Sequence, residues 1–176
     1  MRITFLSSVA AALVAGCAAQ FSALPADAPM QTMTLRWQRL VDESDETCPR
    51  CALTEQEVGR AFEHLKRSLA PAGVRVVLET ERMDETAFLK APLESNRIWI
   101  DGRSLEEWLG AQTAASPCCD ACGSAQCRTV TVGDQTYEAI PAALIVRAGF
   151  LAAGEALRQG PPAPAPGSTM PILDAQ

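Results

Sequence analysis

The chain has 176 residues, a formal net charge of −6 and 48% hydrophobic residues. This acidic balance gives no electrostatic basis for nucleic-acid binding, which depends on a basic surface. The single histidine, His64, gives little support to a Ser/His/Asp or Cys/His nucleophile, whereas seven cysteines point to thiol chemistry.

The N-terminal residues resemble the signal peptide of a bacterial lipoprotein. Arg2 supplies positive charge, and an apolar run over 3–15 follows that is shorter than the roughly 20 residues of a membrane span. The sequence Val14-Ala15-Gly16-Cys17 is similar to a lipobox, in which the cysteine is acylated. We therefore expect a signal peptide over 1–16, lipidation of Cys17, and a membrane-anchored protein of the bacterial envelope that faces the periplasm.

The remaining chain divides by composition into three parts. Residues 17–31 are expected to form a flexible tether, and 159–176, which contain PPAPAPG, a disordered tail. The segment 32–158 is long and apolar enough for one folded domain.

The first part of this domain combines strand and helix patterns around a pair of cysteines. Met33, Leu35 and Trp37 alternate with polar residues, which predicts a half-buried strand. An acidic loop over 42–46 then leads to the motif CPRC at 48–51. Thr54 and Glu57 have the spacing of a capping box, and a stripe of helical period follows them: Val58, Ala61, Phe62, Leu65 and Leu69.

The middle of the domain predicts two more strands and two more helices. The strands are expected over 73–79 and 97–100, because both segments are rich in β-branched residues or apolar alternation. A short helix is expected over 84–90. Ser104 and Glu107 have capping-box spacing, so SLEEWLGA is expected to open another helix.

A cysteine-rich loop, SPCCDACGSAQC, separates these elements from the C-terminal part. RTVTV at 128–132, the turn Gly133-Asp134 and the segment 135–140 predict a hairpin. Pro141 suits the first turn of a final helix over 142–158, which is apolar on most of its surface and is therefore expected to be buried.

This order of elements resembles the thioredoxin-like α/β fold, a sheet flanked by helices. The resemblance rests on the CPRC motif, which lies between a first strand and a first helix. It implies an inserted helix and cysteine-rich loop before the C-terminal hairpin and helix. The sequence departs from that fold family before Ile98, where a proline is usual and Glu94-Ser95-Asn96-Arg97 stands instead.

Four segments together are similar to the bacterial family of domain of unknown function 2703. They are TCPRC, SNRIWIDGRSLEEWLG, SPCCDACG followed by CRTV, and YEAIPAALI. The resemblance spans Thr34 to Ala153 and implies no established activity, so the chemistry has to be argued from the cysteines.

Cys48 and Cys51 are the candidate redox pair, with Cys48 as the attacking thiol and Cys51 as the resolving one. The start of a helix and the neighbouring Arg50 favour a thiolate there, and the acidic run over 42–46 opposes it. The alternatives are a structural disulfide and a pair of metal ligands.

The second thiol cluster is formed by Cys118, Cys119, Cys122 and Cys127. Because Cys118 and Cys119 are adjacent, these four residues are poorly arranged to close around one ion. The alternative metal site therefore takes its ligands from both CxxC pairs: Cys48, Cys51, Cys119 and Cys122. Disulfides are the competing interpretation in an oxidising compartment, with Cys118 and Cys119 in different bridges.

We thus expect an envelope lipoprotein that carries out thiol–disulfide exchange through CPRC, with the loop cysteines as a relay. Its partners would be the membrane and an envelope thiol–disulfide protein. Two alternatives stay open. One is a protein that binds a soft metal ion, such as zinc, copper or mercury, through its thiolates. The other is a non-catalytic lipoprotein in which the disulfides only stabilise the folded core. The loop thiolates would also suit an iron–sulfur cluster, and no other cofactor is expected.

Overall fold

The computed structural model describes residues 30–119 and 122–160. Cys17, the expected signal peptide and nearly all of the expected tether and tail lie outside these residues. Within the described part, no helix combines the length and the apolar character that crossing a membrane requires.

The domain is a mixed α/β structure with two sheets. Its strands are β1 (Gln31–Leu40), β2 (Val74–Met83), β3 (Arg97–Ile100), β4 (Arg103–Ser104), β5 (Gln112–Pro117), β6 (Gln126–Val132) and β7 (Gln135–Tyr137). Its helices are α1 (Pro49–Leu69), α2 (Glu85–Lys90), α3 (Leu105–Leu109) and α4 (Ala142–Gln159), with the 3-10 turns η1 (Ala70–Ala72) and η2 (Pro92–Glu94).

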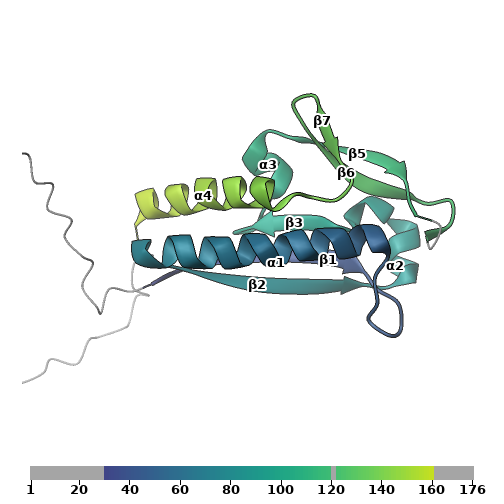
Figure 1. Ribbon diagram of the computed structural model, residues 1–176, viewed down its shortest axis with the longest axis horizontal. Coiled ribbons are helices and arrows are strands. Elements are labelled where there is room, and N and C mark those ends of the chain that lie inside the picture. The colour runs from purple at the N-terminus through teal and green to yellow at the C-terminus, as the bar shows by residue number, and fades with distance from the viewer. Residues whose placement is uncertain (1–29, 120–121, 161–176) are drawn as a thin grey trace, which may run out of the picture.

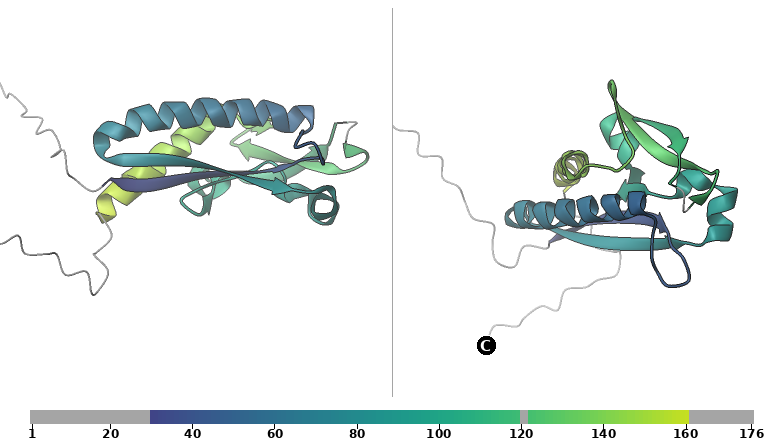
Figure 2. Two further views of the ribbon diagram at one scale, coloured as in Figure 1. Left: turned by 90° about the horizontal axis from the view of Figure 1, so that it is seen from below. Right: turned by 45° about the vertical axis from the view of Figure 1, so that its right-hand side comes forward.

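The larger sheet has the strand order β2-β1-β3-β4. β1 pairs in parallel with β2 over its full length and antiparallel with β3, and β3 pairs antiparallel with β4. Helices α1 and α4 lie side by side over one face of this sheet, and α2 lies at one end (Figures 1 and 2). The smaller sheet, β5-β6-β7, is antiparallel and follows α3.

The core lies between the larger sheet and the α1/α4 layer. The alternation predicted for β1 is confirmed, because Met33, Leu35 and Trp37 are almost completely buried. They pack with apolar residues of α1 and α4 in one cluster. A Cβ atom added at Gly149 of α4 would lie 2.6 Å from the side chain of Leu65 on α1, so the two helices approach closely at this point.

The start of the first helix differs from the prediction. Helix α1 begins at Pro49, with Cys48 as its N-cap, so Thr54 and Glu57 lie inside the helix and do not form a capping box. Thr54 is buried, and its hydroxyl accepts hydrogen bonds from the Asn96 side chain and the Ile140 N–H. A buried threonine inside a helix and one at its start have the same sequence signature.

The expected burial of the final helix is only partly correct. α4 buries one face, but Phe150, Leu151 and Leu157 are 43–47% exposed. The capping box of Ser104 and Glu107 at α3 is confirmed. Strand β5 was not predicted, because TAASP lacks the β-branched pattern of a strand; it forms because it pairs with β6.

The cysteine-bearing end of the domain lies opposite its chain ends. β1 begins at the same end as the last turn of α4 and runs toward α2 and the cysteine loop (Figure 1). Leu40, at the far end of β1, accepts a hydrogen bond from the Thr47 hydroxyl, directly before Cys48.

Candidate functional site: a cluster of cysteine thiols

Cys48 occupies the N-cap position of α1. Its backbone is extended (φ −65°, ψ 155°), and Pro49 follows at the first helical position, where a missing N–H costs nothing. The Cys51 N–H donates to the Cys48 Sγ over 3.5 Å. A sulfur atom at this place meets the positive end of the helix, which favours a thiolate.

Cys51 lies in the first turn of α1 and is 3% exposed. Its Sγ is 3.8 Å from the hydroxyl oxygen of Ser95, the residue before Asn96 in the loop that leads to β3. The same hydroxyl oxygen accepts a hydrogen bond from the Leu40 N–H. Ser95 thus ties the second CPRC cysteine to the end of β1.

The two CPRC thiols have opposite acidities. A hydrogen bond from the Cys51 side chain is the main cause that lowers the pKa of Cys48 to about 5; burial opposes this change. The pKa of Cys51 is raised well above its ordinary value by the same hydrogen bond, by burial and by the charge of Cys48. Cys48 is therefore the thiolate and Cys51 the proton donor beside it.

The four cysteines of the second cluster have two different roles in the structure. Cys118 and Cys127 form a disulfide that links the end of β5 to β6. Cys119 and Cys122 are free thiols, with 3.9 Å between their sulfur atoms. The expectation that the adjacent residues 118 and 119 do not share a bridge agrees with this arrangement.

The loop brings its free thiols to Cys48. The ligand sulfur atoms of Cys48, Cys119 and Cys122 all lie within 4.8 Å of one another, and Cys51 is not a member of this group. The four-ligand set predicted from both CxxC pairs is therefore not assembled: the Cys51 sulfur contacts Cys48 and the Ser95 hydroxyl but does not lie within 4.8 Å of all three other sulfur atoms. Cys122 also lies within the same limit of both disulfide sulfurs.

Cys122 is a much weaker acid than Cys48. Burial, followed by the negative charge of Cys48 and Cys119, raises the pKa of Cys122 to about 12. At neutral pH, the cluster without a metal ion therefore contains the Cys48 thiolate and the protonated thiol of Cys122.

Arg50 holds the loop against the start of α1. Its side chain is 9% exposed and donates to the carbonyl oxygens of Glu138 (3.1 Å) and Arg128 (2.7 Å) and to the Ser116 hydroxyl (2.8 Å). We expected the charge of Arg50 to stabilise the Cys48 thiolate, but in the structure the guanidinium bonds these groups of the loop and the smaller sheet. Its backbone N–H contributes to the low pKa of Cys48.

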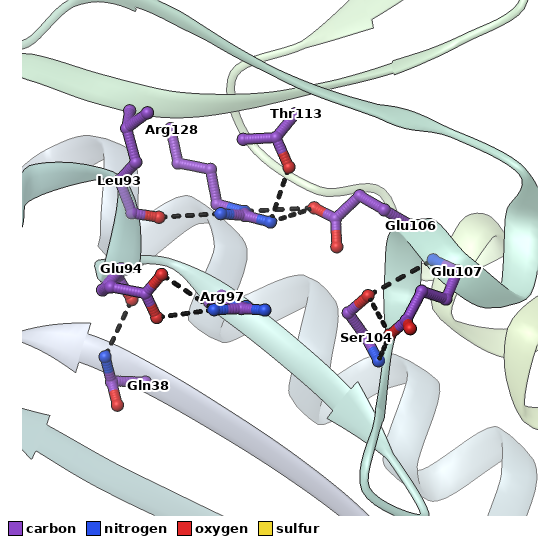
Figure 3. A network of polar contacts seen from close by, with 9 residues as sticks. All are labelled: Gln38, Leu93, Glu94, Arg97, Ser104, Glu106, Glu107, Thr113 and Arg128. Atoms are coloured by element: carbon purple, nitrogen blue, oxygen red, sulfur yellow. Dashed lines mark hydrogen bonds and ion pairs between the residues drawn. The ribbon is translucent and has the colours of Figure 1, made fainter.

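A buried ion pair fixes the smaller sheet from its other side. The Arg128 guanidinium donates to one Glu106 carboxylate oxygen (2.6 and 3.0 Å), to the Leu93 carbonyl (2.8 Å) and to the Thr113 hydroxyl (2.8 Å). Figure 3 shows how these contacts join α3, η2 and the β5-β6 pair. Arg128 therefore fixes the strand that carries Cys127.

A cavity of about 520 Å³ opens beside the thiols. Cys48 and Cys122 both line it, together with apolar residues that include Phe88 and Leu89. Asp42, Glu46 and Glu85 add acidic groups to its wall. A volume of this size suits a small molecule or an extended peptide segment.

Sequence reasoning found the cysteines but not the residues that arrange them. The sequence suggests a role for Arg50 only through its charge. It leaves open whether Asn96 and Arg97, at the start of the strand over 97–100, line the thiol site or form a turn. Asn96 is in fact buried with φ 63°, and its side chain bonds Trp37 and Thr54. The pairing of Arg128 with Glu106 left no local signal, since the two residues are far apart in the sequence.

The fold and the site define a cysteine-rich, mixed α/β domain with a cluster of thiols at one end. The chain belongs to the family described as Domain of unknown function (DUF2703), whose model matches residues 33–149. An uncharacterized protein of Archaeoglobus fulgidus is 41% identical to it over 113 residues, which cover 64% of this chain and 82% of that protein. No solved structure matches the chain.

Proposed function

We propose that this protein carries out thiol–disulfide exchange, with Cys48 as the attacking thiol and Cys51 as the resolving thiol. The observation that carries the proposal is the position of Cys48: its sulfur caps α1, accepts the Cys51 N–H and lines the cavity. A low-pKa thiolate within reach of a buried second thiol is the arrangement that such exchange requires.

The reaction follows from this geometry in two balanced steps. The Cys48 thiolate attacks one sulfur of a substrate disulfide, forms a mixed disulfide, and releases the other sulfur as a thiolate, which takes up a proton from solvent. Cys51 then loses its proton and attacks the Cys48 sulfur. The substrate leaves as a dithiol, and Cys48 and Cys51 end as a disulfide that has supplied two electrons.

The topology supports a thioredoxin-like assignment of the larger sheet. The strand order is β2-β1-β3-β4, and the parallel strands β1 and β2 are joined through α1 as a β-α-β unit. The described residues include no cis peptide bond, and Ser95 and Asn96 precede β3 where that fold family has a proline. We therefore propose that substrates dock against a different backbone edge.

The loop thiols are proposed to act as a relay. In this step, Cys119 or Cys122 attacks the sulfur of Cys48 in its disulfide with Cys51, which regenerates the Cys51 thiol. The second loop thiol then closes the Cys119–Cys122 disulfide and releases Cys48. Support comes from the positions of the sulfur atoms, because those of Cys48, Cys119 and Cys122 all lie within 4.8 Å of one another.

The cellular setting is proposed from residues 1–17 alone. A lipid anchor on Cys17 would place the domain in the bacterial envelope, where its partner would be another thiol–disulfide protein. Mass analysis of Cys17 in protein isolated from its own membranes tests this assignment, because an acylated N-terminal cysteine has a distinct mass.

The experiment that tests the exchange reaction is trapping with a chromogenic small disulfide. In a Cys119→Ser/Cys122→Ser background, which removes the loop thiols, we expect the reduced CPRC pair to release two equivalents of reporter thiol. In the same background, Cys51→Ser should release one equivalent and keep one reporter group in a mixed disulfide at Cys48. Cys48→Ser is the matched variant and should form no such adduct on the CPRC motif. Wild-type protein without any exchange, and with reductant-resistant bridges, would leave only the stapling role.

A further inference from the structure

We propose that Cys48, Cys119 and Cys122 form a three-thiolate binding site for a soft metal ion of the Cu(I) class. The site differs from the four-cysteine set that the sequence suggests, because it omits Cys51. It goes beyond the exchange reaction and shares Cys48, Cys119 and Cys122 with the proposed relay.

The distances between the sulfur atoms suit one shared ion. Sulfur ligands about 2.3 Å from one ion lie about 3.8–4.0 Å apart in tetrahedral or trigonal arrangements. The Cys119 and Cys122 sulfur atoms are 3.9 Å apart, and neither is more than 4.8 Å from the Cys48 sulfur. Binding therefore needs the Cys48 sulfur to move by less than about 1 Å toward the other two sulfur atoms.

The position of its side chain leaves Cys51 out of the group of three ligands. Its sulfur lies 3.8 Å from the Ser95 hydroxyl oxygen, and the residue is 3% exposed. Recruiting it as a fourth ligand would require a change at the start of α1, where its own N–H bonds the Cys48 sulfur.

The ligand set determines the class of ion. Three thiolates are soft donors, which favour Cu(I) over harder cations. Among the described residues, no histidine or carboxylate joins this group of three. His64 lines a separate groove between α1 and α4. Structural zinc is almost always four-coordinate, so three thiolates match the zinc requirement less well than that of Cu(I).

The loop is anchored at its base without the ion. The Cys118–Cys127 disulfide closes its base, and Arg50 binds the Ser116 hydroxyl and the Arg128 carbonyl on either side. The cavity lined by Cys48 and Cys122 gives an ion a path from solvent. Ligands on a loop whose base is anchored before binding lose less conformational freedom when the ion enters.

Anaerobic competition titration with a chromophoric Cu(I) chelator tests the site, using the reduced full chain with the Cys118–Cys127 bridge verified by mass. We expect one Cu(I) per chain. Cys48→Ser, Cys119→Ser and Cys122→Ser should each weaken binding by more than about 100-fold, since loss of an outer-shell partner alone costs about 10- to 100-fold. Cys51→Ser removes an outer-shell partner of the Cys48 sulfur and no ligand, so it should weaken binding by less than about 100-fold. Arg67→Met, on the exposed surface of α1, is the matched control and should bind within about threefold of wild type.

X-ray absorption of the Cu(I)-loaded protein provides a second readout, with three sulfur neighbours expected. Equal losses of affinity in Cys51→Ser and Cys119→Ser would overturn the proposal, as would wild-type protein that cannot compete with the chelator. The disulfide assay on the same samples separates the two functions. Exchange without site-specific Cu(I) binding refutes only the metal site, and Cu(I) binding without exchange refutes only the redox proposal.

Discussion

The Arg50 guanidinium donates a hydrogen bond of 2.7 Å to the main-chain carbonyl of Arg128. This bond joins the CPRC motif to the strand that carries the disulfide cysteine Cys127. The helix start and the cysteine loop are thus held together by a side chain of the motif itself.

Arg50→Met should therefore separate the loop from α1. The variant keeps much of the side-chain length but leaves the Ser116 hydroxyl and two carbonyl groups without their donor, which predicts a loss of about 2–4 kcal/mol in the free energy of unfolding. Urea denaturation measures this loss. Faster alkylation of Cys119 and Cys122 in the native state would show that the loop has been released.

Arg67→Met on the exposed surface of the same helix is the control. It should change stability by less than about 0.5 kcal/mol. A similar small effect of Arg50→Met would contradict the proposed role of Arg50.

Glu106→Gln should be strongly destabilising. It leaves the Arg128 charge buried without a counter-charge, and breaking such a pair costs about 3–5 kcal/mol. The midpoint of urea denaturation is the measurement. Glu63→Gln, at an exposed ion pair with Lys66, should leave the midpoint unchanged. Equal midpoints for the two variants would show that the buried pair contributes nothing.

The acidity of Cys48 can be measured by peptide-resolved alkylation against pH. We expect the rate of Cys48 alkylation to reach half its maximum near pH 5, because its pKa is about 5, whereas Cys51 stays unreactive. Cys51→Ala removes the main hydrogen bond and should raise the pKa of Cys48. If the alkylation rate of Cys48 in wild-type protein continued to rise through pH 8, it would contradict a pKa of about 5 for Cys48.

The same shift predicts how stability depends on pH. The pKa of Cys48 falls from an ordinary value of 9.0 to about 5 on folding. The stabilisation that this shift provides is therefore complete above pH 9 and is lost as the pH falls through 5. The difference in unfolding free energy between reduced wild type and Cys48→Ala should grow between pH 5 and pH 8. A constant difference would contradict it.

The acidic wall of the cavity should select substrates by charge. At low salt, Cys48 is expected to attack the dication cystamine roughly tenfold faster than the dianion dithiodipropionate, because like charges repel. Glu46→Gln combined with Glu85→Gln should reduce this ratio, and Glu43→Gln, outside the cavity lining, should not. A ratio that is the same in all variants and at all salt concentrations would refute the selection.

Much of the fold could be predicted where the pattern is local. The alternation through Met33, Leu35 and Trp37 placed β1, and the family resemblance is confirmed by the match over residues 33–149. The capping box of Ser104 and Glu107 was recognised because both partners lie within one turn. Thr54 and Glu57 have the same spacing, but CPRC lies upstream and already begins the helix.

The candidate site was less accessible from sequence, because its geometry depends on distant contacts. The spacing of the cysteines did not reveal which of the loop thiols would face Cys48. That choice depends on the pairing of Ser116 with Cys127 across β5 and β6, and on Arg50, which reaches both strands. The exclusion of Cys51 depends on Ser95, in a loop over 40 residues away.

The direction of β1 determines which side of the domain its partners meet. β1 begins and α4 ends on the same side of the domain, whereas α1, whose N-cap is Cys48, begins at the opposite end of β1 (Figure 1). Because β1 has ten residues, about 30 Å of strand separates Gln31 from the end at which the thiols lie. The thiols therefore face away from the side of the domain on which residues 31 and 159 lie.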